Sequence, residues 1–124
     1  MRILLTGANG QLGQALQASL APLGTVLPAT RDGRLPGGRT AEVADLSRPE
    51  TLPALVARLS PDRVVNAAAY TAVDRAEDEA GLAFRVNAEA PGALSRACAA
   101  AGIPLLHFST DYVFDGRAQC PLRE

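Results

Sequence analysis

The fold of this chain is decided by one stretch, Thr6-Gly7-Ala8-Asn9-Gly10-Gln11-Leu12-Gly13. An apolar run from Ile3 to Leu5 precedes it and is typical of a short buried strand. Apolar residues follow it at helical spacing and predict one apolar helix face, made of Leu12, Ala15, Leu16, Leu20 and Leu23. A strand, a glycine turn and a helix can bind a pyrophosphate, because N–H groups at the helix start face the phosphates. We therefore predict cofactor contacts at Gly7, Gly10, Gln11, Leu12 and Gly13.

The composition is ordinary for a globular protein. The 124 residues suffice for one domain, with 48% hydrophobic and 20% charged residues. A net charge of −1 gives no electrostatic footprint for nucleic acid or an anionic membrane. No apolar run approaches the ~20 residues of a membrane span. His107 is the only histidine, which excludes a multi-histidine metal site. Cys98 and Cys120 form no C-x-x-C pair, so we expect free thiols and a cytoplasmic location, with a disulfide between them left open.

Strand and helix patterns alternate along the rest of the chain. Further strands are expected over Thr25–Ala29, Ala41–Leu46, Arg63–Ala68 and Ile103–Ser109. Helices are expected from a cap at Ser47 to Leu59, from a polar start over Asp74–Glu79, and from Leu82 to a glycine cap at Gly102, with an interruption at Pro91. Thr30 to Thr40 is rich in glycine, proline and arginine, and is expected to be a flexible surface loop rather than a packed element.

This order of elements predicts an α/β fold. We expect a Rossmann-like, doubly wound parallel sheet with strand order 3-2-1-4-5 and helices on both faces, which makes three layers. Ligands bind such sheets outside the carboxyl ends of the strands, where the strand order reverses. Three stretches fall at those ends: Gly7–Gly13, Ala67–Thr71 and Ser109–Asp111.

The end of the second strand carries Thr30 and Arg31, where a site for NAD usually has an acidic residue. This favours NADPH, with Arg34 and Arg39 nearby, although a solvated basic loop is the alternative. Asp45 ends the third strand and could accept a hydrogen bond from an adenine amino group, or cap the next helix.

Later residues add candidates with less specific signals. Ala67, Ala68 and Ala69 would let a cofactor lie against the backbone, or would serve tight packing. Asn87 is unfavourable inside a helix unless it bonds to something, with exposure as the alternative. A hydroxyl in Ser109-Thr110-Asp111-Tyr112 could stabilise charge on a substrate carbonyl, although these residues are also common in turns. His107 is expected to be a satisfied core or interface histidine.

Three stretches together resemble the dTDP-4-dehydrorhamnose reductases, which are extended short-chain dehydrogenases. They are Thr6–Gly13, Asn66-Ala-Ala-Ala-Tyr-Thr-Ala-Val-Asp74, and His107-Phe-Ser-Thr-Asp-Tyr-Val-Phe-Asp-Gly116. The resemblance implies NADPH-dependent reduction of dTDP-4-dehydro-L-rhamnose to dTDP-L-rhamnose. It also implies that Gly10, Gln11 and Leu12 hold the pyrophosphate, that Asp45 and Leu46 meet the adenine, and that Ala69, Tyr70 and Thr71 line the cofactor. Thr110 corresponds to the catalytic Ser/Thr and touches the sugar together with Asp111. Thr30 differs from the acidic residue of some members, which supports NADPH and leaves NADH possible.

The family's proton donor is the tyrosine of a Y-x-x-x-K motif, which this chain does not contain. All twelve basic residues are arginine, and neither Tyr70 nor Tyr112 has a lysine four residues later. We therefore expect residues 1–124 to be the cofactor-binding domain, ending before that motif and the substrate domain, and to be inactive alone. The alternatives are a non-catalytic dinucleotide-binding module, similar to the regulatory subunit of methionine adenosyltransferase, or another nucleotide-sugar epimerase or dehydratase. A homodimer is left open.

Overall fold

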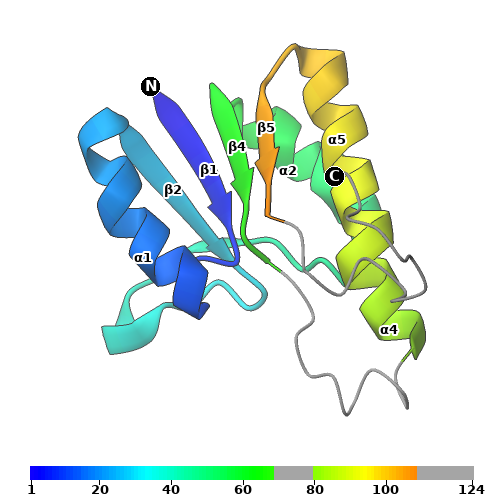
Figure 1. Cartoon of the computed structure of the whole chain (residues 1–124), viewed down its shortest axis with the longest axis horizontal. Helices are drawn as coiled ribbons and strands as arrows, with labels where there is room; N and C mark the ends of the chain where they lie inside the picture. The colour runs from blue at the N-terminus through cyan, green and yellow to red at the C-terminus, as the bar shows by residue number, and fades with distance from the viewer. Residues whose placement is uncertain (69–79, 109–124) are drawn as a thin grey trace, which may run out of the picture.

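The computed structural model describes residues 1–68 and 80–108. Its centre is a five-stranded sheet in the order β3-β2-β1-β4-β5 (Figure 1). The strands are β1 (Arg2–Thr6), β2 (Thr25–Thr30), β3 (Glu42–Val43), β4 (Arg63–Asn66) and β5 (Leu105–His107). Every neighbouring pair is parallel, which confirms the predicted fold class and strand order. The strands β3, β4 and β5 are shorter than predicted because their ladders cover only a few residues.

Helices cover both faces of the sheet, as the alternating pattern predicts. Figure 1 shows α1 (Gln11–Leu20) on one side, and α2 (Leu52–Leu59) and α5 (Ala90–Ala101) on the other. Alternate residues of β1 point to the two sides: Leu4 packs with α2 and α5, while Ile3 and Leu5 belong to the cluster under α1. The central strands are therefore apolar on both faces, as buried parallel strands must be.

The apolar face predicted for the first helix is narrower than expected. Within α1, Leu16 and Leu20 pack against the sheet and Gly13 is buried, whereas Ala15 is exposed and Leu12 is 40% exposed. Leu23 lies beyond the helix in the 3-10 turn η1 (Ala21–Leu23) and is 59% exposed. The residues that touch the sheet are spaced by three and four, so the helix contacts it along one line.

The segment predicted to be a flexible surface loop is exposed over most of its length, as predicted, but it is not free of packing, because one residue anchors it to the core. Arg34 and Thr40 form an antiparallel bridge, and the turn between them contains the 3-10 element η2 (Pro36–Gly38). Leu35 is only 7% exposed and joins the apolar cluster under α1. A single apolar residue anchors this polar segment, because burying one leucine side chain yields about 1.5–3 kcal/mol.

Proline 91 is accommodated by a change of helix type. The chain passes from α4 (Ala80–Phe84) through the π-helix η4 (Arg85–Glu89) into α5, where Pro91 lies in the first turn. Proline lacks an N–H group and its ring crowds the carbonyl four residues earlier, so a wider π turn relieves the conflict. Gly102 ends α5 with φ 70°, which confirms the predicted glycine cap.

Within residues 1–68 and 80–108, no helix has the length and apolar character needed to cross a membrane. Cys98 is a free thiol on α5, and burial raises its pKa above the usual value. The predicted helix start over Asp74–Glu79 lies outside the described residues.

Candidate functional site

Two glycines of the first turn are required by close packing. Gly7 follows β1 with φ 69°, and a Cβ there would lie 2.6 Å from backbone atoms of Ala68. A Cβ on Gly13 would lie 2.0 Å from the Gly7 carbonyl oxygen. Any larger residue would therefore push β1, α1 and the chain after β4 apart. The glycines bring α1 onto the end of the sheet at the point where the strand order reverses.

The third glycine has space around it. Gly10 is the N-cap of α1 with φ −74°, which any residue can adopt, and its Cβ would meet only the Gly7 carbonyl oxygen at an ordinary 3.4 Å. Nothing in the described protein therefore demands glycine here. A glycine that the protein itself does not need is expected where a ligand approaches the backbone.

The start of α1 offers N–H donors that have no acceptor within the helix. Among the described residues no side chain caps the helix, and its first turn contains no acidic residue. The N–H groups of the first helical residues, Gln11, Leu12 and Gly13, have no acceptor within the helix, since the first intrahelical bond runs from Gln14 to Gly10 at 2.9 Å. Together with the helix dipole, these donors favour a negatively charged group.

The polar side chain of Thr30 is turned into its own loop. Thr30 is 1% exposed, and its hydroxyl accepts a 2.9 Å hydrogen bond from the N–H of Arg34 and donates to Oδ1 of Asp32 at 3.4 Å. The same carboxylate oxygen accepts a 3.2 Å bond from the Arg34 N–H. Asp32 is the only acidic residue between residues 30 and 40, and its side chain bonds within the loop.

The guanidinium groups of the same loop point outward. Arg31, Arg34 and Arg39 are all exposed, and in the described part of the chain none has a carboxylate within ion-pair distance. Arg39 donates a 3.4 Å bond to the Pro36 carbonyl. Arg31 and Arg34 are left as positive charges beside the carboxyl end of β2.

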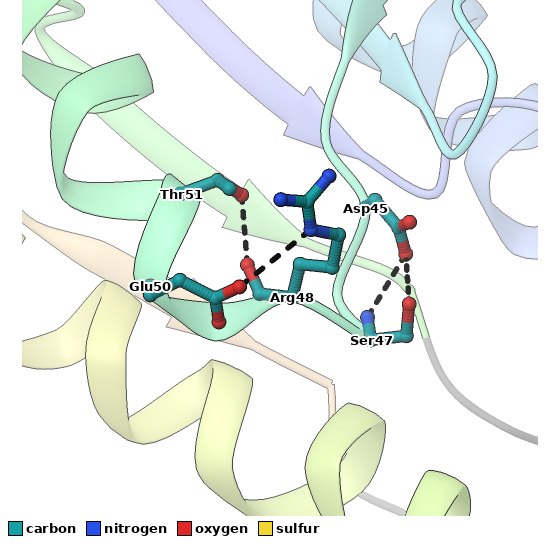
Figure 2. Close-up of polar contacts among 5 residues, drawn as sticks. All are labelled: Asp45, Ser47, Arg48, Glu50 and Thr51. Carbon is teal, nitrogen blue, oxygen red and sulfur yellow. Dashed lines mark hydrogen bonds and ion pairs between the residues drawn. The ribbon is translucent and has the colours of Figure 1, made fainter.

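Asp45 organises the segment after β3, as Figure 2 shows. Its Oδ1 accepts hydrogen bonds from the N–H of Ser47 at 3.0 Å and from the Ser47 hydroxyl at 2.6 Å. The predicted cap at Ser47 is therefore wrong: a short 3-10 element, η3 (Pro49–Thr51), precedes α2, and Ser47 bonds backwards to Asp45. Leu46 is 4% exposed in the core beneath α2 and α5, so only its backbone could meet an adenine.

The residues after Asp45 also bond locally. Arg48 lies 3.6 Å from Glu50 in an exposed ion pair, and its carbonyl accepts a 2.7 Å bond from the Thr51 hydroxyl (Figure 2). Such an exposed pair adds little stability. These contacts shape the turn into α2 rather than a ligand site.

A row of polar residues crosses the carboxyl ends of three strands, with Thr6 and Asn66 buried and His107 exposed, and most of it was not predicted from the sequence. Thr6, Asn66 and His107 lie directly opposite one another on β1, β4 and β5. The Thr6 hydroxyl donates to Asn66 Oδ1 at 2.5 Å, and the same oxygen accepts a 3.2 Å bond from the Ala68 N–H. The signal in the sequence that could have predicted this row is that the apolar strands β1 and β4 each end in a polar residue, Thr6 and Asn66.

This row determines the roles of the two ends of the Asn66 amide. Since Oδ1 accepts two bonds, the group facing His107 Nδ1 at 3.0 Å is the NH₂ donor. His107 Nδ1 is therefore the acceptor, and the neutral ring carries its proton on Nε2. His107 has a hydrogen-bond partner, as predicted, but the residue is exposed, so the predicted place in the core is wrong.

Of the remaining predicted site residues, some lie beside the glycine turn and others do not. Ala67 and Ala68 are half-buried, and Ala67 donates a 3.1 Å bond to the Thr6 carbonyl, which holds them beside Gly7. Asn87 is exposed and lies on η4, which is distant in sequence from the glycine turn. Five predicted residues lie outside the described residues: Ala69, Tyr70, Thr71, Thr110 and Asp111.

Comparison with known proteins places this geometry in a family. The whole chain, residues 1–124, matches the family described as RmlD substrate binding domain. The chain belongs to the RmlD substrate binding domain family. A dTDP-4-dehydrorhamnose reductase of Burkholderia thailandensis is 52% identical over the whole chain. The chain spans 38% of the length of that relative.

Solved structures agree with the RmlD assignment. A dTDP-4-dehydrorhamnose reductase from Clostridium acetobutylicum has a TM-score of 0.80 and 36% identity, over 98% of this chain and 40% of its own. A dTDP-4-dehydrorhamnose reductase from Bacillus anthracis, solved in complex with NADP, has a TM-score of 0.76 and 34% identity, over 94% of this chain and 39% of its own. The Rossmann-like fold and the likeness predicted from the sequence are confirmed.

Proposed function

We propose that this chain is the NADPH-binding part of a dTDP-4-dehydrorhamnose reductase. The observation that carries the proposal is the turn at the start of α1, where Gly10 leaves open space and the helix N–H groups have no acceptor within the helix. A pyrophosphate fits both features, because it is anionic and must approach the backbone closely. The likeness to a reductase solved with NADP supports the choice of cofactor.

The adenosine end of the cofactor would lie near the ends of β2 and β3. Arg31, with Arg34 beside it, would meet the 2′-phosphate, since guanidinium groups bind phosphate through paired hydrogen bonds. The loop holds Asp32 through its Oδ1. The positive charges of Arg31 and Arg34 favour NADPH over NADH. Asp45 has a second carboxylate oxygen for the adenine amino group, which both cofactors share.

The other end of the cofactor would lie beside β4 and β5, near Ala67 and Ala68. NADPH supplies a hydride when it is bound, and the dTDP-sugar would receive it at C4. By the likeness to the reductases, Thr110 is the proposed catalytic hydroxyl, and Thr110 with Asp111 would contact the sugar. The proposed location is the cytoplasm, where a free thiol such as Cys98 stays reduced.

Calorimetric titration of NADPH and NADH tests the cofactor assignment. We expect NADPH to bind more tightly, and Arg31→Ala to reduce the preference for NADPH about ten-fold, which corresponds to ~1.4 kcal/mol. Arg63→Ala is the matched control, because Arg63 is an exposed arginine at the amino end of β4, whereas the proposed site lies at the carboxyl ends of the strands. Equal affinity for both cofactors in the unaltered protein contradicts the assignment.

Loss of NADPH absorbance in the presence of dTDP-4-dehydro-L-rhamnose tests the reaction. We expect turnover by the intact natural protein and its loss on Thr110→Val. The 124-residue chain alone should bind NADPH without turnover, since it contains no lysine for a Y-x-x-x-K motif. Cofactor binding without turnover by the intact protein would instead identify a regulatory dinucleotide-binding module.

A further inference from the structure

The carbonyl groups of the glycine turn all have partners on the protein side. The Gly7 carbonyl accepts a 3.1 Å bond from the Gly10 N–H, and the Gly10 carbonyl accepts from Gln14. The two carbonyls between them are bound by side chains of α1. Gln17 Nε2 donates to the Ala8 carbonyl at 2.8 Å, and Gln14 Nε2 donates to the Asn9 carbonyl at 2.9 Å.

These two bonds set the direction of two peptide groups. In a trans peptide the N–H points opposite to the C=O, so a carbonyl held toward α1 turns the following N–H away from the helix side chains. Gln17 holds the carbonyl of the Ala8–Asn9 peptide group. The N–H of this group belongs to Asn9 and has no acceptor among the described residues. Gln14 holds the carbonyl of the Asn9–Gly10 peptide group. The N–H of this group belongs to Gly10 and donates to the Gly7 carbonyl, which closes the turn.

The alternative orientation would oppose an anion. Rotation of the Ala8–Asn9 peptide group would aim its carbonyl oxygen outward and withdraw the Asn9 N–H from the same place. Rotation of the Asn9–Gly10 peptide group would aim its carbonyl oxygen outward and break the bond from the Gly10 N–H to the Gly7 carbonyl, which closes the turn. Successive backbone N–H groups that face one way form an anion-binding concavity, and a single reversed peptide dipole weakens it. The two glutamines therefore act on the backbone of the turn, not on the ligand itself.

We propose that Gln17 and Gln14 are positioning residues of the phosphate-binding turn. Gln17 holds the Ala8–Asn9 peptide group so that the Asn9 N–H faces a pyrophosphate, and Gln14 holds the Asn9–Gly10 peptide group so that its carbonyl oxygen faces away from the pyrophosphate and the turn stays closed. This inference rests on the proposed function, because it presumes a dinucleotide at this turn. Gln17 has the larger effect, since its bond to Ala8 is partly buried whereas the bond from Gln14 to Asn9 is exposed to competing water.

The test compares two ligands in the intact natural protein. NADPH contains the pyrophosphate, whereas adenosine 2′-monophosphate has the adenosine and the 2′-phosphate without it. Gln17→Met keeps the length of the side chain and removes the donor. Ser19→Met makes a polar-to-methionine change at an exposed position of the same helix and is the control. Dissociation constants for both ligands and the thermal midpoint are measured for each variant.

We expect Gln17→Met to weaken NADPH binding about 3- to 10-fold, the loss expected for one hydrogen bond, and Gln14→Met to weaken it less. Binding of adenosine 2′-monophosphate should stay unchanged, as should both constants in Ser19→Met. Unchanged NADPH affinity in Gln17→Met overturns the proposal, and so does an equal loss for both ligands. If the unaltered folded protein fails to bind NADPH, the proposed function fails, and the positioning role fails with it.

Discussion

The Thr6 hydroxyl and the Asn66 side-chain oxygen are joined by a 2.5 Å hydrogen bond that ties the carboxyl end of β1 to that of β4. Both residues are fully buried. Asn66 also binds the Ala68 N–H, so the bond fixes the chain that lies against Gly7. The place where the strand order reverses is therefore held by side chains as well as by the ladder between the strands.

Thr6→Val should destabilise the protein by about 1–2 kcal/mol, because it keeps the shape of the side chain but removes the donor to a buried oxygen. Urea unfolding measures the change. Thr25→Val is the control, because Thr25 begins β2 at an exposed position, and it should change stability by less than about 0.5 kcal/mol. Equal effects of the two substitutions would show that the Thr6 hydroxyl contributes nothing specific.

The neutral imidazole of His107 should carry its proton on Nε2, because Nδ1 accepts from the Asn66 amide. Nitrogen-15 chemical shifts of the ring, recorded where the ring is neutral, distinguish the two tautomers. Asn66→Ala should yield a mixture of tautomers, since the donor is gone. A protonated Nδ1 in the unaltered protein would contradict the assigned orientation of Asn66.

The glycines of the turn should separate stability from binding. Gly13→Ala places a Cβ 2.0 Å from the Gly7 carbonyl and should destabilise the fold by about 3 kcal/mol or more. Gly10→Ala meets only a 3.4 Å contact and should cost less than about 1 kcal/mol, while NADPH affinity drops because the Cβ lies where the pyrophosphate approaches. Thermal melting and calorimetric titration of both variants check this contrast.

Leu35 should matter more than its place in a polar loop suggests. Leu35→Ala removes a side chain that is 7% exposed and should cost about 2 kcal/mol, the low end for a buried leucine. Leu23→Ala is the control, because Leu23 is 59% exposed. Hydrogen exchange should also become faster at the Leu35 and Ala41 amides, which bond across the loop. Equal losses of stability in the two variants would count against the anchoring role.

Cys98 gives a pH dependence with a definite sign. Burial raises its pKa in the folded protein above the usual 9.0, so the unfolded chain loses the thiol proton first as the pH rises. Below about pH 9 the thiol should not affect stability, and above it the free energy of unfolding should fall. Denaturant unfolding across this range in Cys120→Ser measures the decrease, which Cys98→Ala in the same background should lack. The same slope in both would assign the decrease to other groups.

The sequence predicted the elements whose cause is local. The run Ile3–Leu5, the spacing of Gly7, Gly10 and Gly13, and the cap at Gly102 each act within a few residues, so periodicity and glycine placement were sufficient. The alternation of strands and helices then restricted the sheet to one order, which the ladders confirm. The likeness to the reductases rested on the same kind of continuous stretch.

Only the tertiary structure decided which side chains meet. Thr6 and Asn66 are 60 residues apart, and Asn66 and His107 are 41 apart, so their contact depends on the register of three strands. Leu35 could be recognised as an anchor only once α1 and β1 made a cluster beside it. The carbonyls that Gln14 and Gln17 bind face them only because Gly13 lets α1 approach the turn. Local pattern therefore determined the elements, while long-range packing determined the hydrogen bonds that shape the proposed cofactor site.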